Sequence, residues 1–228
     1  MKNLWVTRLL LVAILASCKD AAIEDGEDCS VRVSGIEFTK CLNNAKALVA
    51  VTSEKLILKS NAKSDYFNEP DGTQSISNAP VLLMKIDNSK PFTFTAKVTP
   101  TFLETYDAGA LYIYSSKDSW FKFAFERDER TRTRAVTVRT MKTSDDNNHD
   151  VIDSTSMFMK ISSDTKTIGF YYSLDQKNWQ LVRLFRNEYP RETWIGVSTQ
   201  SPLGQGTTST FEAFSFTLNS IKNFRLGI

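Results

Sequence analysis

The chain has 228 residues, of which 41% are hydrophobic, 24% charged and 11% aromatic. These fractions are those of a chain that can bury a core, so they exclude a disordered protein. The formal net charge is +2, and Lys2 and Arg8 account for it, because the other 26 basic residues are matched by 26 acidic ones. Without a basic excess, the chain is not expected to bind nucleic acid or an anionic membrane surface.

The first residues have the pattern of a signal peptide. Two basic residues are followed by the apolar run 9–15, which is shorter than the roughly 20 residues of a transmembrane helix. The tetrapeptide Leu-Ala-Ser-Cys at 15–18 resembles the bacterial lipobox, whose cysteine carries diacylglycerol. We therefore predict a lipoprotein signal peptide over 1–17 and lipidation at Cys18. An ordinary secretory signal is the alternative.

An acidic segment follows the predicted lipid site. Residues 19–30 contain few large apolar side chains, which is typical of a tether. An acidic stretch at this place resembles the surface-export signal of Bacteroidetes lipoproteins. We predict a lipidated tether over 18–30 and a single folded domain over 31–228. The expected location is the cell envelope, in the outer membrane on its surface or periplasmic side, with the lipid as the one contact with the membrane.

Two further cysteines, Cys29 and Cys41, could form a disulfide or remain as buried thiols. Disulfides persist in exported proteins, and closing this loop would stabilise the fold by roughly 3 kcal/mol. Two thiols and the single histidine, His149, do not make a zinc site. The chain also lacks a glycine-rich phosphate loop, so neither a metal nor a cofactor is expected.

From about residue 31 onwards, short apolar or alternating runs follow one another. They predict strands at 81–86, 92–98, 120–126, 135–141, 166–173, 193–199 and 211–218. Turns rich in Gly, Pro, Asn, Asp and Ser separate them, and no segment has a sustained helical stripe. About a dozen strands at this spacing predict an all-β domain, either a sandwich or a barrel.

The strand at 120–126 has two different faces, because side chains alternate across a strand. Its three phenylalanines share one face and are predicted to be core. Trp120, Lys122 and Glu126 share the other face. A tryptophan can stack on a sugar while charged groups bond its hydroxyls, so this is our candidate ligand-binding face. The alternative is a solvated outer strand with a cross-strand ion pair.

Other strands supply side chains that a curved sheet could gather onto the same face. Alternation places Tyr112, Ser198 and Gln200 opposite apolar neighbours, and Arg183 on the same side as Trp179. The candidate ligand-binding set is therefore Trp120, Lys122, Glu126, Arg183, Tyr112, Asp107, Ser198 and Gln200. For the tryptophans at 179 and 194, the alternative is simple burial in the core.

Several segments in this order resemble the DUF1349 family. They are 106–111, 120–126, 172–183, the Ser-Pro pair at 201–202 and Gly206. The resemblance covers roughly residues 40–218 and implies a two-sheet antiparallel jelly roll of the concanavalin A-like type, the fold of many lectins and glucanases. It also implies similarity to β-sandwich modules attached to some β-xylosidases, but no established reaction. Ala110 and Gln176 depart from the family where similar sequences tend to have glycine.

No catalytic motif is present in the sequence. Jelly-roll glucanases carry their acids as Glu-x-Asp-x-x-Glu or a near variant, and the chain has no such pattern. A Ser-His-Asp triad would need His149, which lies in the polar segment 144–150 that we predict to be a solvated loop. The Asp and Asn oxygens of this segment could hold Ca²⁺, although it lacks the spacing of a calcium loop.

The sequence leads to three functional hypotheses. The favoured one is an outer-membrane lipoprotein whose lectin-like sandwich binds a glycan or polysaccharide without catalysis. The second is a glycosidase that uses Glu126 with a carboxylate brought near it by the fold, such as Asp107 or Glu212. The third is an envelope module that binds a protein partner.

Overall fold

The structure is a computed structural model that describes residues 26–228. The predicted signal peptide, Cys18 and most of the predicted tether lie outside the described residues. The first sheet has the strand order β1 (Glu27–Val33), β2 (Ile36–Leu42), β7 (Val81–Asp87), β16 (Glu192–Gln200), β9 (Ala108–Ser116), β10 (Ser119–Arg127), β11 (Thr133–Met141) and β12 (Thr143–Val151).

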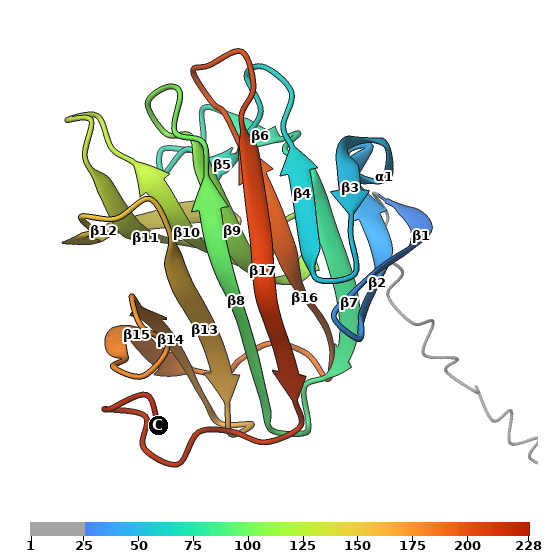
Figure 1. The fold of residues 1–228 in the computed structure, drawn as a ribbon, viewed down its shortest axis with the longest axis vertical. Helices are drawn as coiled ribbons and strands as arrows, with labels where there is room; N and C mark the ends of the chain where they lie inside the picture. Colours follow the sequence, from blue (N-terminus) through green and yellow to red (C-terminus); the bar gives the residue numbers. More distant parts are fainter. Residues whose placement is uncertain (1–25) are drawn as a thin grey trace, which may run out of the picture.

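The second sheet has the order β15 (Gln180–Arg186), β14 (Thr167–Ser173), β13 (Met157–Ser163), β8 (Phe92–Pro100), β17 (Thr208–Thr217), β4 (Lys55–Lys59) and β3 (Val49–Val51). It lies in front of the first sheet in Figure 1. A hairpin of β5 (Tyr66–Asn68) and β6 (Ser75–Ser77) and the short helix α1 (Ala45–Leu48) complete the fold. All strand pairs in the two sheets are antiparallel, as the sequence predicts for a sandwich.

The core lies between the two sheets. Phe121, Phe123 and Phe125 of β10 are fully buried there, so the predicted core face of this strand is confirmed. Phe170 of β14 stacks on Phe123 with ring centroids 5.3 Å apart. Each such side chain contributes roughly 1.5–3 kcal/mol by leaving water.

A second, smaller apolar cluster covers part of the outer face of the first sheet. Tyr66 of the β5–β6 hairpin packs edge-on against Tyr112 and Trp120, at centroid distances of 6.0 and 5.7 Å. Asn43 fixes the hairpin, because its side-chain amide donates to the Tyr66 hydroxyl (3.1 Å) and to the Ala79 carbonyl (2.7 Å). The hairpin therefore covers one half of the outer face of the first sheet, and the other half is not covered by it.

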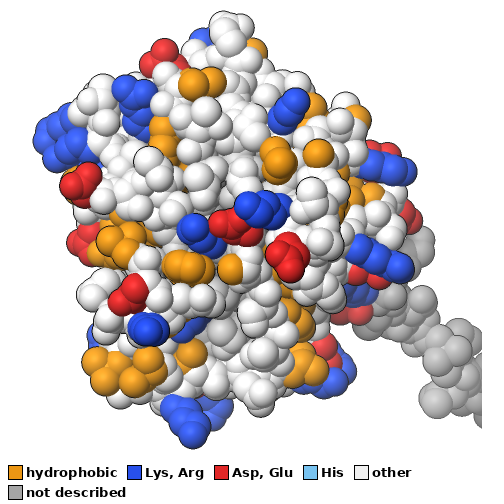
Figure 2. All heavy atoms as spheres, viewed as in Figure 1, with side chains coloured by type: hydrophobic (Ala, Val, Ile, Leu, Met, Phe, Trp, Pro, Cys, Tyr) orange, Lys and Arg blue, Asp and Glu red, His pale blue; other side chains and the backbone are white. Residues whose placement is uncertain are grey.

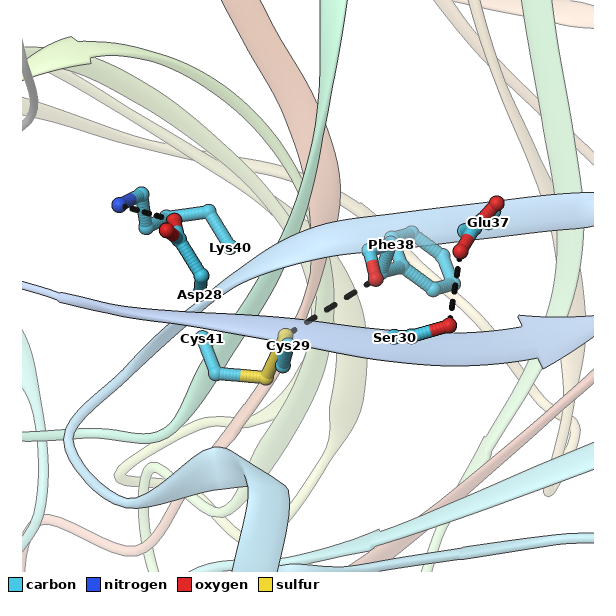
Figure 3. Close-up of a disulfide and its surroundings, with 7 residues drawn as sticks. All are labelled: Asp28, Cys29, Ser30, Glu37, Phe38, Lys40 and Cys41. Carbon is cyan, nitrogen blue, oxygen red and sulfur yellow. Dashed lines mark hydrogen bonds and ion pairs between the residues drawn. A yellow bond between two sulfur atoms is a disulfide. The ribbon is translucent and has the colours of Figure 1, made fainter.

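The folded domain begins earlier than the sequence predicts. β1 starts at Glu27, so the end of the predicted tether 18–30 belongs to a strand. Pairing with β2 explains this, since Cys29 and Cys41 form a disulfide with a Cα–Cα distance of 5.9 Å (Figure 3). Beside it, the Asp28 carboxylate pairs with Lys40 of β2 at 2.8 Å, so this acidic residue contributes to the pairing of the two strands.

The predicted solvated loop at 144–150 is also wrong, because these residues form the edge strand β12. Its backbone pairs with β11, for example Asn147 opposite Thr137. The polar composition that indicates a loop is equally typical of an edge strand, which charged side chains protect from pairing with another chain.

No helix within residues 26–228 is long and apolar enough to cross a membrane.

Candidate functional site

A cavity of about 330 Å³ opens on the uncovered half of the outer face of the first sheet. Its floor comes from β10, β11 and β12, and its walls come from the ends of strands and the loops beside them. The lining residues on the floor are Lys122, Glu126, Val136, Val138, Asp146 and Asn148. Those of the walls are Asp65, Phe67, Glu69, Tyr106, Glu129, Gln200, Pro202 and Leu203.

Small side chains make room for the polar groups of this face. Strand register places Ala108 between Gln200 of β16 and Glu126 of β10. Because alanine has only a methyl group, the Gln200 side chain reaches over it and donates from Nε2 to Glu126 Oε2 at 3.3 Å. Two strands that are far apart in sequence thus share one polar network.

Lys122 is a structural cation at the centre of this network. Only 2% of it is exposed, and its ammonium donates to Asp65 Oδ1 (3.1 Å), the Tyr66 carbonyl (2.9 Å) and Gln200 Oε1 (2.8 Å). An ammonium has three donors, so all of them are occupied. Lys122 therefore fastens the β5 segment and β16 to the floor of the sheet instead of offering a proton to a ligand.

Glu126 is buried, with 7% exposure, but incompletely bonded. Gln200 donates to Oε2, and no residue within 26–228 donates to Oε1. Burial raises the pKa of the Glu126 carboxyl to about 8; Lys122 opposes this shift, while the negative charges of Asp146 and Asp65 add to it. At neutral pH this carboxyl group is protonated and can donate a hydrogen bond into the cavity.

Two half-buried aromatic residues, Phe67 and Tyr106, stand at the wall of the cavity. Tyr106 has a φ of 66°, a left-handed conformation that is uncommon for a bulky residue. Its N–H donates to the Arg127 carbonyl (2.7 Å) and its carbonyl accepts from Gln200 Nε2 (3.2 Å), which holds the backbone in place. Burial, followed by the charges of Glu129 and Glu126, raises the pKa of the Tyr106 hydroxyl.

Sequence reasoning missed both aromatic residues as site residues. Tyr106 opens a segment that resembles the family, and that segment was the only signal for it. The sequence does not indicate the left-handed backbone conformation that positions the Tyr106 ring, since neither residue next to Tyr106 is Gly or Pro.

The predicted stacking role of Trp120 is wrong. Its side chain is fully buried beneath Tyr66 and 6.0 Å from Tyr112, and its Nε1 donates to the Lys117 carbonyl at 3.2 Å. Tyr112 is also fully buried. Both residues do lie on the predicted face of the first sheet, but the β5–β6 hairpin covers that half of it.

Two further predicted residues support loops instead of facing the cavity. Asp107 is fully buried, and its carboxylate accepts the N–H groups of Leu103 and Glu104, each at 2.9 Å, as well as the Ser201 hydroxyl at 2.6 Å. Ser198 is buried and donates to the Pro80 carbonyl at 2.8 Å.

Arg183 belongs to the second sheet and lies outside the cavity. Its guanidinium donates to Thr137 and to Asp145, both at 3.1 Å, and lies 5.1 Å from the Phe121 ring. It therefore bridges the two sheets at their open edge. Of the eight predicted ligand-binding residues, the structure gathers Lys122, Glu126 and Gln200 at the cavity.

The carboxylates near Glu126 differ from those considered in the sequence. The Asp107 carboxylate already accepts hydrogen bonds from two backbone N–H groups and a serine hydroxyl. Glu212 lies on the second sheet, where it pairs with Lys55 (3.0 Å) and Lys97 (3.2 Å). The cavity instead contains Asp146 and Glu129, and burial raises the pKa of Asp146. Within residues 26–228, no group of three or more His, Cys, Asp or Glu side chains is placed to hold a metal ion.

Two other surfaces of the molecule differ from this cavity. A wider depression of about 600 Å³ follows β14 and β15, where Lys166, Arg186 and backbone line it and no carboxylate converges. The face of the second sheet carries charges of both signs between scattered apolar side chains (Figure 2). Unlike these two surfaces, the 330 Å³ cavity combines convergent polar groups with aromatic walls, which is the usual character of a ligand site.

A model of the family described as "Protein of unknown function (DUF1349)" matches residues 42–219. A functionally unknown protein from Saccharomyces cerevisiae is similar, with a TM-score of 0.71 and 21% identity over 78% of this chain and 95% of that one. The GH43 BlXynB protein from Bacillus licheniformis gives a TM-score of 0.60 and 14% identity over 80% of this chain and 36% of that one. The Bacteroides ovatus protein Xyloglucan PUL GH43B gives a TM-score of 0.58 and 14% identity over 84% of this chain and 38% of that one.

At 21% identity or less, these similarities show that the proteins share a fold. The chain covers well under half of each of the two GH43 proteins. No curated protein matches it in sequence. The predicted two-sheet antiparallel jelly roll of the concanavalin A-like type is confirmed by the sheet topology together with these structural neighbours.

Proposed function

The chain belongs to the DUF1349 family, whose function is unknown. We propose that its cavity binds a sugar unit of a glycan or polysaccharide without catalysis. The observation that carries this proposal is the pairing of aromatic walls with a polar floor. Tyr106 and Phe67 offer ring faces on which a sugar ring can stack. Glu126, Asp146 and Asn148 offer acceptors and donors for its hydroxyls. The GH43 fold neighbours make a carbohydrate ligand a natural first choice.

The test is a binding screen of the purified protein against neutral, amino and acidic oligosaccharides. Tyr106→Ala should weaken binding at least tenfold, because stacking on an aromatic ring contributes an interaction of about 1 kcal/mol or more beside the area it buries. Tyr172→Ala is the matched control, since Tyr172 is a half-buried tyrosine of the second sheet outside the cavity. Equal binding by both variants, or no binding by a well-folded protein, would contradict the proposal.

A glycosidase is a second candidate, because Glu126 is protonated at neutral pH while other carboxyl groups share its cavity. Glycosidases use such a pair, one carboxyl as acid and the other as base or nucleophile. Release of reducing sugar by the wild type and its loss in Glu126→Gln, with binding retained, would favour this candidate. Binding without any release favours the lectin-like role.

We further propose that lipid on Cys18 anchors the protein in the cell envelope, in the outer membrane. The signal pattern before Cys18 supports this, and so does the Cys29–Cys41 disulfide, which is typical of exported proteins. Mass spectrometry of the mature protein should find diacylglycerol on its first residue, and Cys18→Ser should abolish the modification. A mature chain that starts elsewhere and carries no lipid would refute the anchor.

An envelope protein partner is the third proposal. It would need an exposed apolar patch of several hundred square ångströms, and the mixed charges on the face in Figure 2 give it less support than the cavity gives a sugar.

A further inference from the structure

The ionisable side chains that line the cavity are almost all acidic. Five of them are carboxylic acids, and Lys122 is the only basic one. The acids are Asp65, Glu69, Glu126, Glu129 and Asp146. They come from the β5 segment, β10, the β10–β11 turn and β12, so the excess of acid is built by four separate parts of the chain.

Lys122 does not balance this charge. Its ammonium is occupied by Asp65, the Tyr66 carbonyl and Gln200, so it neutralises one carboxylate at most. Glu129 has only a 4.0 Å contact to the exposed Arg130. No basic group within residues 26–228 lies within 4.0 Å of a carboxylate oxygen of Glu69, Glu126 or Asp146.

A second observation points to a ligand at the same place. Glu126 is more than nine-tenths buried and lines the cavity, yet its Oε1 accepts no hydrogen bond within the described residues. Oε1 therefore remains available on the cavity side of the carboxyl group, where a donor from outside the chain can bond it. The acids also act on one another, since the charge of Asp65 is among those that raise the pKa of Glu126 and of Asp146, and the charge of Asp146 is among those that raise the pKa of Glu126.

We propose that the sugar bound in this cavity carries a free, positively charged amino group. This inference rests on the proposed function and specifies its ligand as an amino sugar that is not N-acetylated. The ammonium lies between Asp146 and Glu126, and the sugar ring lies against Tyr106 and Phe67. Glu126 is protonated in the free protein, and it releases this proton to solvent when the ammonium takes its place, so that both carboxylates face the cation. An ammonium can also interact favourably with the faces of those aromatic rings. A uronic acid would meet like charge and is rejected.

The test compares four trisaccharides by calorimetry at about pH 6, where a sugar amine is protonated. They are glucosamine, N-acetylglucosamine, galacturonic acid and xylose oligomers. The glucosamine trisaccharide should bind at least tenfold more tightly than its N-acetylated form, and added salt should reduce that preference. Asp146→Asn should reduce it as well. Asp145→Asn is the matched control, because Asp145 is the adjacent residue on β12 and pairs with Arg183 away from the cavity.

The possible failures are distinguishable. If the N-acetylated, neutral or acidic trisaccharide binds as well as the glucosamine form, the charge inference is overturned while glycan binding stands. If a simple diamine binds and no sugar does, the cavity selects for positive charge. That result would refute both the proposed glycan binding and the proposed amino-sugar ligand. If Asp145→Asn weakens glucosamine binding as much as Asp146→Asn, the preference reflects overall charge, and the placement of the ammonium is overturned.

Discussion

The two faces of β10 show how differently the same strand can be used. The face between the sheets carries three fully buried phenylalanines, which pack on rings such as Phe170. The outer face instead buries Lys122 and Glu126. The Lys122 partners Asp65 and Gln200 lie 57 and 78 residues from it in sequence, and Gln200 also bonds Glu126 across 74 residues. The first face is stabilised by the burial of apolar surface, and the second by hydrogen bonds and an ion pair among buried polar groups. Substitutions should therefore separate the two faces by size of effect and by dependence on pH.

The largest effect is expected in the core between the sheets. Phe123→Ala should lower the free energy of unfolding by about 4 kcal/mol, because it removes a buried ring and leaves a cavity. The loss should be the same at pH 5 and pH 9, since the ring stacks on Phe170 and belongs to the apolar core cluster. Urea unfolding of the variant and the wild type at pH 5 and pH 9 measures this loss of stability. A loss that varies strongly with pH would show that the two faces are coupled.

A somewhat smaller loss is expected from Lys122→Met, which keeps the length of the side chain but removes its charge. Asp65, the Tyr66 carbonyl and Gln200 would each lose a hydrogen-bond donor. Breaking a buried pair in this way costs about 3 kcal/mol. The matched control is Lys85→Met, because Lys85 forms an exposed pair with Glu192 and should contribute less than about 1 kcal/mol. Equal losses in the two variants would mean that the buried network adds little to stability.

The sequence predicts the first face well and the second only in part. Alternation alone places the phenylalanines of β10 in the core, because a sandwich has one interior and apolar side chains must enter it. Alternation also places Trp120 and Glu126 correctly on the opposite face. It cannot show that a hairpin from residues 66–77 covers one of them and leaves the other open. That outcome depends on contacts between distant segments, as does the position of the proposed binding surface beside Tyr106 instead of Trp120.

The outer face should also respond to pH. The pKa of Glu126 is raised by burial from 4.5 to about 8 in the folded protein, so the folded state holds this proton more tightly than the unfolded state does. Its stabilising contribution is therefore present at low pH and is lost as the pH rises from about 5 to 8. The charges facing it are Lys122, Asp146, Asp65 and Glu129, and the pKa of Asp146 is raised in the same direction.

Glu126→Gln should remove much of this pH dependence. At pH 9 the variant should be more stable than the wild type by roughly 2 kcal/mol, less than the whole pKa shift implies because Lys122 loses a negative neighbour. Near pH 5 the two proteins should differ little. Thermal unfolding across pH 5–9 gives both curves. If the variant is less stable than the wild type at pH 9, Glu126 is ionised and well paired in the folded protein.

The smallest effect on stability, and the clearest separation of stability from binding, is expected at Tyr106. Glycine adopts its left-handed φ of 66° without strain, but it also gains freedom in the unfolded chain. These effects oppose each other, so Tyr106→Gly should change the free energy of unfolding by less than about 1 kcal/mol. Sugar binding should still fall at least tenfold, because the ring is lost. A variant that binds normally would mean that the strained backbone at Tyr106 serves the loop, and that the ligand is held by the carboxyl groups alone.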